Sequence, residues 1–460
     1  MIWLPDHILA ADVQSCAVKT IKCREGPRDA NCASEGDILD SRKLNCSPGI
    51  ARAGGAASAV FAWSPLPRAH SADIGFIKMK INFKISAEEF KQKYQEKLPF
   101  VIKGAVDTSD VRWADINDII SRCDPQSENF RVSFPSGNID KEKYVHTYFH
   151  VGDVRRKLNK PALYGFLRQG GTLVANHIYD EPRFNDYAKD VAQFTGRQTV
   201  TSAYVAFGKT DSYREHWDSR DVFAVQLKGR KRWVVYAPSF EAPLYMHQSK
   251  FIEDKYPCPE EPYLDFILEE GDVFYIPRGW WHNVTPLGEP TVHLAIGTFP
   301  AFAVDYAKWV FRQLPECIHA RMALENYGQD KETIRLLAEA ISERLNDPAC
   351  YREFMEAHVA DQILETRLNL EALGDASIGV LARDAQVRLN VLRSDISDNY
   401  LVTSNGKVWF QDELRILKDF LVENPQVSVA QIEEKFPAHA RDELSEVLYS
   451  LATNGTIEIL

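Results

Sequence analysis

The stretch His216-Trp217-Asp218-Ser219-Arg220-Asp221, which leads into the apolar run Val222–Leu227, decides how this sequence is interpreted. Side chains two residues apart on an extended chain point to the same side, so His216 and Asp218 can reach one metal ion. His282 closes a second segment, Gly-Asp-Val-Phe-Tyr-Ile-Pro-Arg-Gly-Trp-Trp-His, which begins at Gly271. Two imidazoles and one carboxylate suit Fe(II) and leave three positions of an octahedron open. The sequence therefore predicts a metal site formed by His216, Asp218 and His282.

The segments that flank these residues have the composition of β-strands. Val222–Leu227 and Lys231–Tyr236 are joined around Gly229, and Asp272–Ile276 and Thr291–Ile296 are further runs rich in β-branched and aromatic residues. They predict an all-β unit, a barrel or jelly roll whose open end gathers the three ligands. Two plainer interpretations compete, because a His-x-Asp triplet also occurs at surface strand ends, and a histidine beside two tryptophans can be structural.

The region from about Ser202 to Pro300 resembles the JmjC-type cupin oxygenases, and within them the bacterial and nucleolar ribosomal oxygenases. The segments that carry the resemblance run from His216 to Tyr236 and from Gly271 to His282. It implies an α+β fold with a double-stranded β-helix (jelly-roll, cupin) core. It also implies a protein hydroxylase that uses Fe(II), 2-oxoglutarate and O2 to modify an Arg or His side chain of a ribosomal protein. A JmjC-type lysine demethylase and a non-catalytic metal-binding cupin remain open as alternatives.

The resemblance also assigns a binding site for the co-substrate. The distal carboxylate of 2-oxoglutarate needs a cation, and Lys231 occupies the place where the family has its basic anchor. Ser202 and Tyr204 lie on the strand that offers hydrogen bonds to the co-substrate, and alternation puts both on one face. The competing interpretation treats Lys228–Arg232 as a solvated basic hairpin and the strand as an ordinary one.

Three other residues attract attention near these motifs. Asp221 is expected either to face a cationic substrate side chain or to form a surface ion pair. His146 and His150, in His-Thr-Tyr-Phe-His, lack the glutamate of a zinc-protease helix. Because they lie among aromatic residues, we predict that they pack.

Composition limits the class of protein. The chain has 460 residues, 45% of them apolar and 26% charged, which is typical of two or three soluble domains. A formal charge of −11 argues against a nucleic-acid coat, and no apolar run approaches the ~18 residues of a membrane span. No C-x-x-C pair occurs among the eight cysteines, and the first residues lack the basic start of a signal peptide. We therefore expect a cytoplasmic protein with free thiols.

The pattern divides the chain into four parts. Residues 1–78 lack periodicity, and we predict an extension that is disordered or not native, with translation starting at Met79. Residues 79–302 form the catalytic domain, in which Ser86–Glu89 is a capping box for a helix through Leu98, after the strand-like Ile81–Ile85. A second helix is predicted from Pro182 to Phe194, ended by Gly196.

The last two parts are predicted to be mostly helical. Residues 303–395 have amphipathic periodicity, and the resemblance implies that this domain forms a homodimer. Residues 396–460 suggest a winged helix, with helices at Phe410–Val422, Ser428–Phe436 and Arg441–Thr453 and a strand at Gly455–Leu460. Residues 401–460 hold five basic and ten acidic residues, so direct DNA binding is disfavoured and a structural or protein-docking role is expected.

Overall fold

The computed structural model describes residues 80–460 apart from 363, 365, 369, 371–378, 411–413, 425 and 437–440. The predicted extension 1–78 and the predicted start at Met79 lie outside this range. The four cysteines in the described part are free thiols. None of the helices described there is both long enough and apolar enough to cross a membrane.

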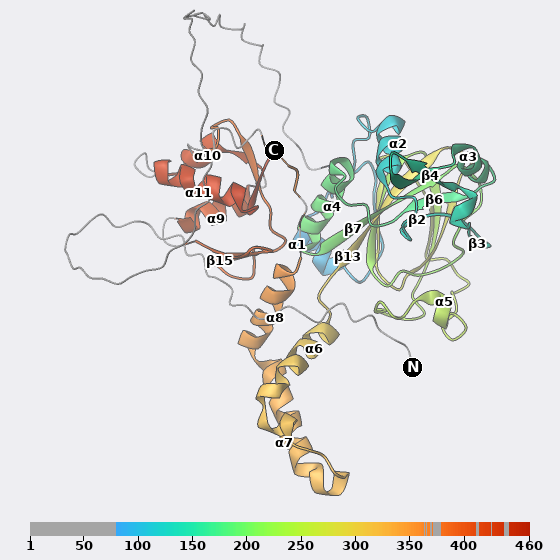
Figure 1. The fold of residues 1–460 in the computed structure, drawn as a ribbon. Helices are drawn as coiled ribbons and strands as arrows, with labels where there is room; N and C mark the ends of the chain where they lie inside the picture. Colours follow the sequence, from blue (N-terminus) through green and yellow to red (C-terminus); the bar gives the residue numbers. More distant parts are fainter. Residues whose placement is uncertain are drawn as a thin grey trace, which may run out of the picture. The chain divides into compact units, whose positions relative to one another are not determined.

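Two antiparallel sheets form the β core (Figure 1). The larger has the order β1-β11-β8-β13-β7-β6-β2-β3, and its strands are β1 (Phe100–Ile102), β2 (Phe130–Phe134), β3 (Gly137–Asn138), β6 (Thr172–Ala175), β7 (Gln198–Ala206), β8 (Asp221–Lys228), β11 (Val273–Ile276) and β13 (Thr291–Phe299). The smaller has the order β10-β9-β12, formed by β10 (Leu264–Leu268), β9 (Lys231–Tyr236) and β12 (Trp281–Pro286). The four β-rich runs seen in the sequence thus become strands of this core.

Strand β8 is buried on both faces, which explains its unbroken apolar sequence. Phe223, Val225 and Leu227 belong to a large core that also contains residues of the helices. Val222 and Ala224 point the other way and join a second cluster with Trp233 and Val235 of β9. One face of the large sheet is therefore covered by helices, whereas the other packs against the small sheet.

The helices of this domain begin and end where their local chemistry dictates. They are α1 (Ala87–Lys93), α2 (Trp113–Arg122), α3 (Lys160–Arg168), α4 (Pro182–Thr195) and the short α5 (Ser249–Ile252). The Ser86 hydroxyl accepts a hydrogen bond from the Glu89 amide, as predicted, but α1 stops at Lys93 rather than Leu98 because the backbone turns left-handed at Glu96. Helix α4 follows its prediction and ends at Gly196, whose φ is 67°. The predicted strand Ile81–Ile85 is reduced to one bridge at Ile81, since Lys84 is also left-handed.

The segment between β3 and α3 is a hairpin outside both sheets. It follows a 3-10 turn, η1 (Lys141–Lys143), and consists of β4 (Val145–His150) and β5 (Asp153–Leu158), which pair only with each other. His146 and His150 are exposed on it, so the prediction that they pack is wrong. No other sheet or helix covers the faces of this two-stranded ribbon in the described chain. Its side chains are therefore exposed, even though aromatic residues are adjacent in the sequence.

After the β core the chain is helical, as predicted, in α6 (Ala303–Gln313), α7 (Tyr327–Asn346) and α8 (Pro348–Ala360), with 3-10 turns η2 (Leu314–Glu316) and η3 (Ile318–Arg321). The C-terminal part contains α9 (Leu414–Glu423), α10 (Val429–Glu433), α11 (Arg441–Thr453), a β17-β14-β18 sheet and a β15-β16 ribbon. These strands are β14 (Gln386–Leu389), β15 (Tyr400–Thr403), β16 (Gly406–Trp409), β17 (Val427–Ser428) and β18 (Ile457–Ile459). Because β14 pairs with β17 and β18, this sheet includes residues before the predicted division at 395/396.

Candidate metal centre

The two motif segments meet at an antiparallel bridge between His216 and His282. The His216 amide donates to the His282 carbonyl at 3.1 Å, and the His282 amide donates back at 2.8 Å. Bridged residues direct their side chains to the same face, and the two imidazole rings lie 4.3 Å apart. Asp218, two residues further on, follows to that face. One ligand atom from each of the three residues lies within 4.8 Å of the others, so these predicted ligands are brought together.

The hydrogen bonds of the imidazoles leave the correct nitrogens for a metal ion. His216 Nδ1 lies 3.1 Å from the Arg214 carbonyl oxygen, and His282 Nδ1 lies 3.1 Å from that of Trp280. A carbonyl can only accept, so each Nδ1 carries the proton and each Nε2 keeps its lone pair. This orientation by a backbone acceptor is typical of metal-bound histidines.

Tryptophan packing on the opposite side holds the two segments together. Trp217 and Trp281, adjacent to the two histidines, are buried and make an edge-to-face contact at 4.6 Å. Gly279 donates its amide to the Asp218 carbonyl at 3.0 Å. It has φ 85°, and a Cβ there would lie 2.9 Å from the Phe240 carbonyl oxygen, so only glycine fits this turn. The ligands are thus positioned by rigid neighbours.

Electrostatics favour the metal-binding protonation states. Burial raises the pKa of Asp218, but Arg220 and the two histidines outweigh it, and the pKa ends below its usual value. Burial, together with the neighbouring His216, lowers the pKa of His282 to about 4. At neutral pH the carboxyl group is therefore ionised and this imidazole is neutral, as a metal requires.

A cavity of about 240 Å³ opens beside these ligands, between the two sheets. Lys231, the predicted anchor, lines it, is buried, and lies 2.8 Å through Nζ from His293 Nδ1. Tyr204 pairs with His293 across β7 and β13, and their rings stack at 4.9 Å. The Trp233 ring lies 5.8 Å from both His282 and His293, which places it between the metal ligands and the lysine.

The polar groups deep in this cavity are suited to an anion. Within the described residues Lys231 has no acidic partner, and burial lowers the pKa of its amine to about 7. His293, whose pKa burial and Lys231 push well below normal, is neutral and can accept from the amine. The Trp233 indole N–H is buried without a hydrogen-bond partner in the described part of the chain. A bound carboxylate would satisfy both donors.

The sequence prediction and the cavity differ at three residues. Ser202 was predicted to hydrogen-bond the co-substrate, and two residues that line the cavity were not predicted. Ser202 is buried opposite Ala295 on β13, yet it is not among the residues that line the cavity. His293 and Trp233 were missed as site residues. The signal for His293 was its polarity inside the apolar run Thr291–Ile296, where alternation gives it the face of Ala295 rather than that of Leu294 and Ile296.

Comparison with known proteins begins with a family match. Residues 174–306 match the family described as JmjC domain, and this range contains all three candidate metal ligands and Lys231. This segment is similar to JmjC domains. The match runs from β6 into α6 and so includes most of the large sheet and the whole small one.

Curated relatives agree with the JmjC domain. The chain is 35% identical over 159 residues to ribosomal oxygenase 2 of Rattus norvegicus, which is 32% of this chain and 33% of that protein. It is 26% identical over 156 residues to the bifunctional lysine-specific demethylase and histidyl-hydroxylase NO66 of Drosophila mojavensis, 32% of this chain and 17% of that protein. The chain thus spans a third or less of the length of these relatives.

The fold resembles solved structures over a larger part of the chain than the sequence matches extend. The crystal structure of Escherichia coli ribosomal oxygenase YcfD superposes with a TM-score of 0.52 at 16% identity, covering 83% of this chain and 100% of that one. A YcfD structure in complex with cobalt and 2-oxoglutarate gives a TM-score of 0.51 at 16% identity, with 82% and 98% covered. These matches confirm the predicted cupin-type core of mixed α and β content.

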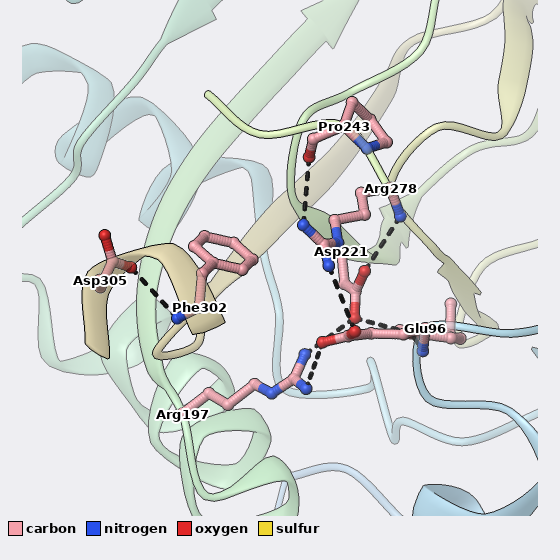
Figure 2. A network of polar contacts seen from close by, with 8 residues as sticks. Glu96, Arg197, Asp221, Pro243, Arg278, Phe302 and Asp305 are labelled. Carbon is pink, nitrogen blue, oxygen red and sulfur yellow. Dashed lines mark hydrogen bonds and ion pairs between the residues drawn. The ribbon is translucent and has the colours of Figure 1, made fainter. Parts of the chain in front are cut away.

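A network of ion pairs and hydrogen bonds is centred on the buried Asp221 (Figure 2). Asp221 binds Arg197 at 3.0 Å, accepts from the Tyr275 hydroxyl at 2.8 Å, and accepts from the Arg278 amide at 3.0 Å. Both expectations for Asp221 are wrong, since it is 2% exposed and contacts neither solvent nor the cavity. Three residues after Asp218, it points to the opposite face of the strand.

Glu96 extends the same network between two arginines. Its carboxylate lies 2.6 Å from Arg197 and 3.3 Å from Arg278 (Figure 2). The Arg278 guanidinium also donates to the Pro243 carbonyl and stacks 4.5 Å from the Phe302 ring. Since Arg278 lies four residues before His282, the network fixes the start of the turn that carries this ligand.

Proposed function

We propose that this chain is an Fe(II)- and 2-oxoglutarate-dependent protein hydroxylase. The observation that carries the proposal is the buried amine of Lys231, which has no acidic partner among the described residues and lies in the same cavity as the cluster His216, Asp218 and His282. Metal ligands alone would suit many metalloproteins. An anion site deep in the same cavity fits a co-substrate that is a metal chelator at one end and a carboxylate at the other.

The residues present fit both absent groups. His216, Asp218 and His282 would hold iron, which with dioxygen and 2-oxoglutarate supplies the oxidising power for C–H hydroxylation, releasing succinate and CO2. The Lys231 ammonium would bind the distal carboxylate, and His293 orients the amine by accepting a hydrogen bond from it. Tyr204, whose pKa is raised by burial, keeps its hydroxyl protonated and contributes to the wall of the cavity. The cobalt and 2-oxoglutarate named for the YcfD structure support this co-substrate.

The substrate that we propose is an Arg or His side chain of a ribosomal protein. Relatives named ribosomal oxygenase 1 and 2 and histidyl-hydroxylase support it. Electrostatics agree, because a chain with a formal charge of −11 attracts basic partners. Lysine demethylation is the second candidate, since the same NO66 relatives are also named lysine-specific demethylases.

Mass spectrometry separates these outcomes. The protein is incubated with Fe(II), 2-oxoglutarate and ribosomal proteins, and succinate release and substrate masses are recorded. We expect a gain of one oxygen on one protein, whereas loss of methyl groups with formaldehyde would support the demethylase. Metal binding with no 2-oxoglutarate consumption for any substrate would contradict both and favour a non-catalytic cupin.

The role of Lys231 is tested by binding rather than turnover. Lys231→Met should weaken 2-oxoglutarate binding to the Mn(II)-loaded protein by about 2–5 kcal/mol, because the carboxylate loses its buried cation. The matched control is Lys228→Met, which removes a nearby lysine paired with Glu270 at 2.6 Å and absent from the cavity lining. Equal losses in the two variants, measured by calorimetry without oxygen, would remove Lys231 from the site.

The regions after the catalytic domain have proposed roles of their own. We infer that α6–α8 form a homodimer interface, because Phe311, Met322, Leu324 and Tyr327 expose large apolar side chains there. Light scattering should report a dimer that Phe311→Asp weakens and the matched Ile416→Asp on α9 does not. A monomeric wild type would refute this. The C-terminal part is proposed as a winged-helix-like module for protein docking, given its acidic balance.

A further inference from the structure

Within the described chain, the hairpin β4–β5 is anchored at its base alone. Tyr144 and Val145 are buried, and the Asn159 amide donates to the Tyr144 carbonyl at 2.8 Å, which closes the ribbon. Beyond that point every residue from His146 to Lys157 is exposed. Isolated hairpins are only marginally stable in water. Six paired positions with no covering layer therefore suggest that this hairpin has a function other than stabilising the fold.

One face of this ribbon alternates aromatic rings with cations. Tyr148 stands opposite Arg155, and His146 stands opposite Lys157. The Lys157 ammonium lies 4.9 Å from the centre of the Tyr148 ring. Residues directly opposite each other on an antiparallel pair have neighbouring side chains, so rings and charges form one continuous surface.

The charges of the hairpin are available to a partner. Within the described residues no ion pair involves Arg156 or Lys157, and Arg155 meets only Asp153, at 3.3 Å on the surface. An exposed pair of that kind holds its partners weakly. The hairpin is thus a basic surface on a chain whose formal charge is −11.

Apolar side chains are also displayed at its tip. Phe149 is 74% exposed and Val151 is 89% exposed. Val151 has φ 47° and Gly152 has φ 89°, the two left-handed positions of a tight hairpin turn. A β-branched residue is strained at such a position, where Asn or Gly would be more stable. The turn therefore keeps an exposed apolar side chain at a cost in conformational energy.

We propose that the β4–β5 hairpin binds single-stranded RNA. On one face Arg155 and Lys157 pair with phosphates and Tyr148 stacks on a base, while Arg156 and Phe149 offer the same two kinds of contact on the other face of the ribbon. A lipid surface fits less well, because Asp153 places a carboxylate beside Val151 and Val154 where acyl chains would lie. The choice of RNA over DNA rests on the proposed function, since a ribosomal-protein substrate is met together with ribosomal RNA.

The test measures binding without turnover. Fluorescence anisotropy of the full chain with a labelled oligouridine of about twenty nucleotides is followed as KCl rises from about 50 to about 200 mM. In Arg155→Glu/Arg156→Glu/Lys157→Glu we expect an affinity loss of at least tenfold, and a plot of log K against log salt flatter by about 2, since three phosphate contacts are lost. Tyr148→Ala/Phe149→Ala should lose about fivefold or more with the salt slope unchanged.

The matched control is Lys91→Glu/Lys250→Glu/Lys255→Glu, which changes the charge equally at three exposed lysines elsewhere. Equal loss in the control and hairpin variants would overturn the proposal, as would a wild type that leaves the oligomer free at low salt. Oligothymidine bound as tightly as oligouridine would overturn the choice of RNA, and binding only to phosphatidylserine vesicles would replace it with a membrane. Succinate release, assayed separately, tests the proposed function alone, and an unchanged thermal midpoint shows that the hairpin variants fold.

Discussion

The two faces of the large sheet use the same strands for different purposes. On β8, Phe223 and Val225 face the helices in an apolar core, whereas Val222 and Ala224 face the small sheet. On β13, Leu294 and Ile296 join the first core, whereas His293 and Ala295 line the cavity. The helix-covered face is apolar along the middle of these strands, and Asp221 at the start of β8 is buried there only because Arg197 and the Tyr275 hydroxyl bind it. The cavity face can carry chemistry because the rigid apolar face behind it keeps the strands in register.

The first prediction tests whether side chains on the cavity face contribute to chemistry and not to stability. Asp218→Ala should abolish metal binding and succinate release, because two imidazoles alone leave the ion without its anionic ligand. The free energy of unfolding of the metal-free protein should change by less than about 1 kcal/mol, since the side chain is not part of either core. Cobalt absorption and urea denaturation measure the two effects. Retained turnover would remove Asp218 from the site.

The helix-covered face should behave in the opposite way. Phe223→Ala should lower the free energy of unfolding by about 3–5 kcal/mol, because it leaves a cavity among Phe83, Phe90 and Tyr275. The folded fraction should bind metal with unchanged affinity. Denaturation combined with a cobalt titration tests this, and a large loss of metal affinity at full folding would show that the two faces are not separable.

Asp221 is expected to affect both faces. It is buried against Arg197, and it also accepts from the Arg278 amide in the turn that leads to His282. In Asp221→Asn the charge that Arg197 meets is lost, so unfolding should become easier by about 1–3 kcal/mol. Metal affinity should fall by about tenfold, because the turn that leads to His282 loses its brace. The control Asp265→Asn removes an exposed partner of Arg232 and should change neither quantity measurably. Unchanged metal affinity in Asp221→Asn would limit the network to stability.

The smallest effect concerns pH. The amine of Lys231 has a pKa of about 7 in the folded protein, so above that pH less of it is charged and 2-oxoglutarate affinity should fall up to tenfold per pH unit. Stability without ligand should change in the other direction. Between about 7 and the unfolded value near 10.4 the unfolded chain binds more protons, so stability rises with pH. Calorimetry from pH 7 to 9 tests both, and the Lys231→Met protein should show neither trend.

The grouping of the candidate metal ligands, and the place of Lys231 in the same cavity, could be predicted from the sequence because their signals are local. His216 and Asp218 are two residues apart, and Lys231 follows a glycine turn on the next strand, so spacing along the chain already orders them. His293 could not be assigned, since a histidine in an apolar strand is also compatible with simple packing. Asp221 was misjudged, because its partner Arg197 lies twenty-four residues away and nothing local predicts a buried ion pair.

The exposed hairpin is the converse case: Asp221 is buried where exposure was expected, whereas His146 and His150 are exposed where packing was expected. His146 and His150 have aromatic neighbours in the sequence, which favoured packing, but the ribbon they belong to pairs with no other strand in the described chain. Whether an alternating strand is covered depends on what lies above it. That information is absent from the strand itself.

The sequence by itself determined the four central strands β8, β9, β11 and β13, the alternation that gives each residue its face, and the chemical types of the candidate metal ligands. Tertiary structure alone decided that His282 bridges to His216, that Lys231 lies beside His293 with no acidic partner in the described part of the chain, and that Asp221 turns inward to Arg197. The reason is physical. Secondary structure follows from neighbours a few residues away, whereas burial and ion pairing follow from whichever distant segment packs against each face.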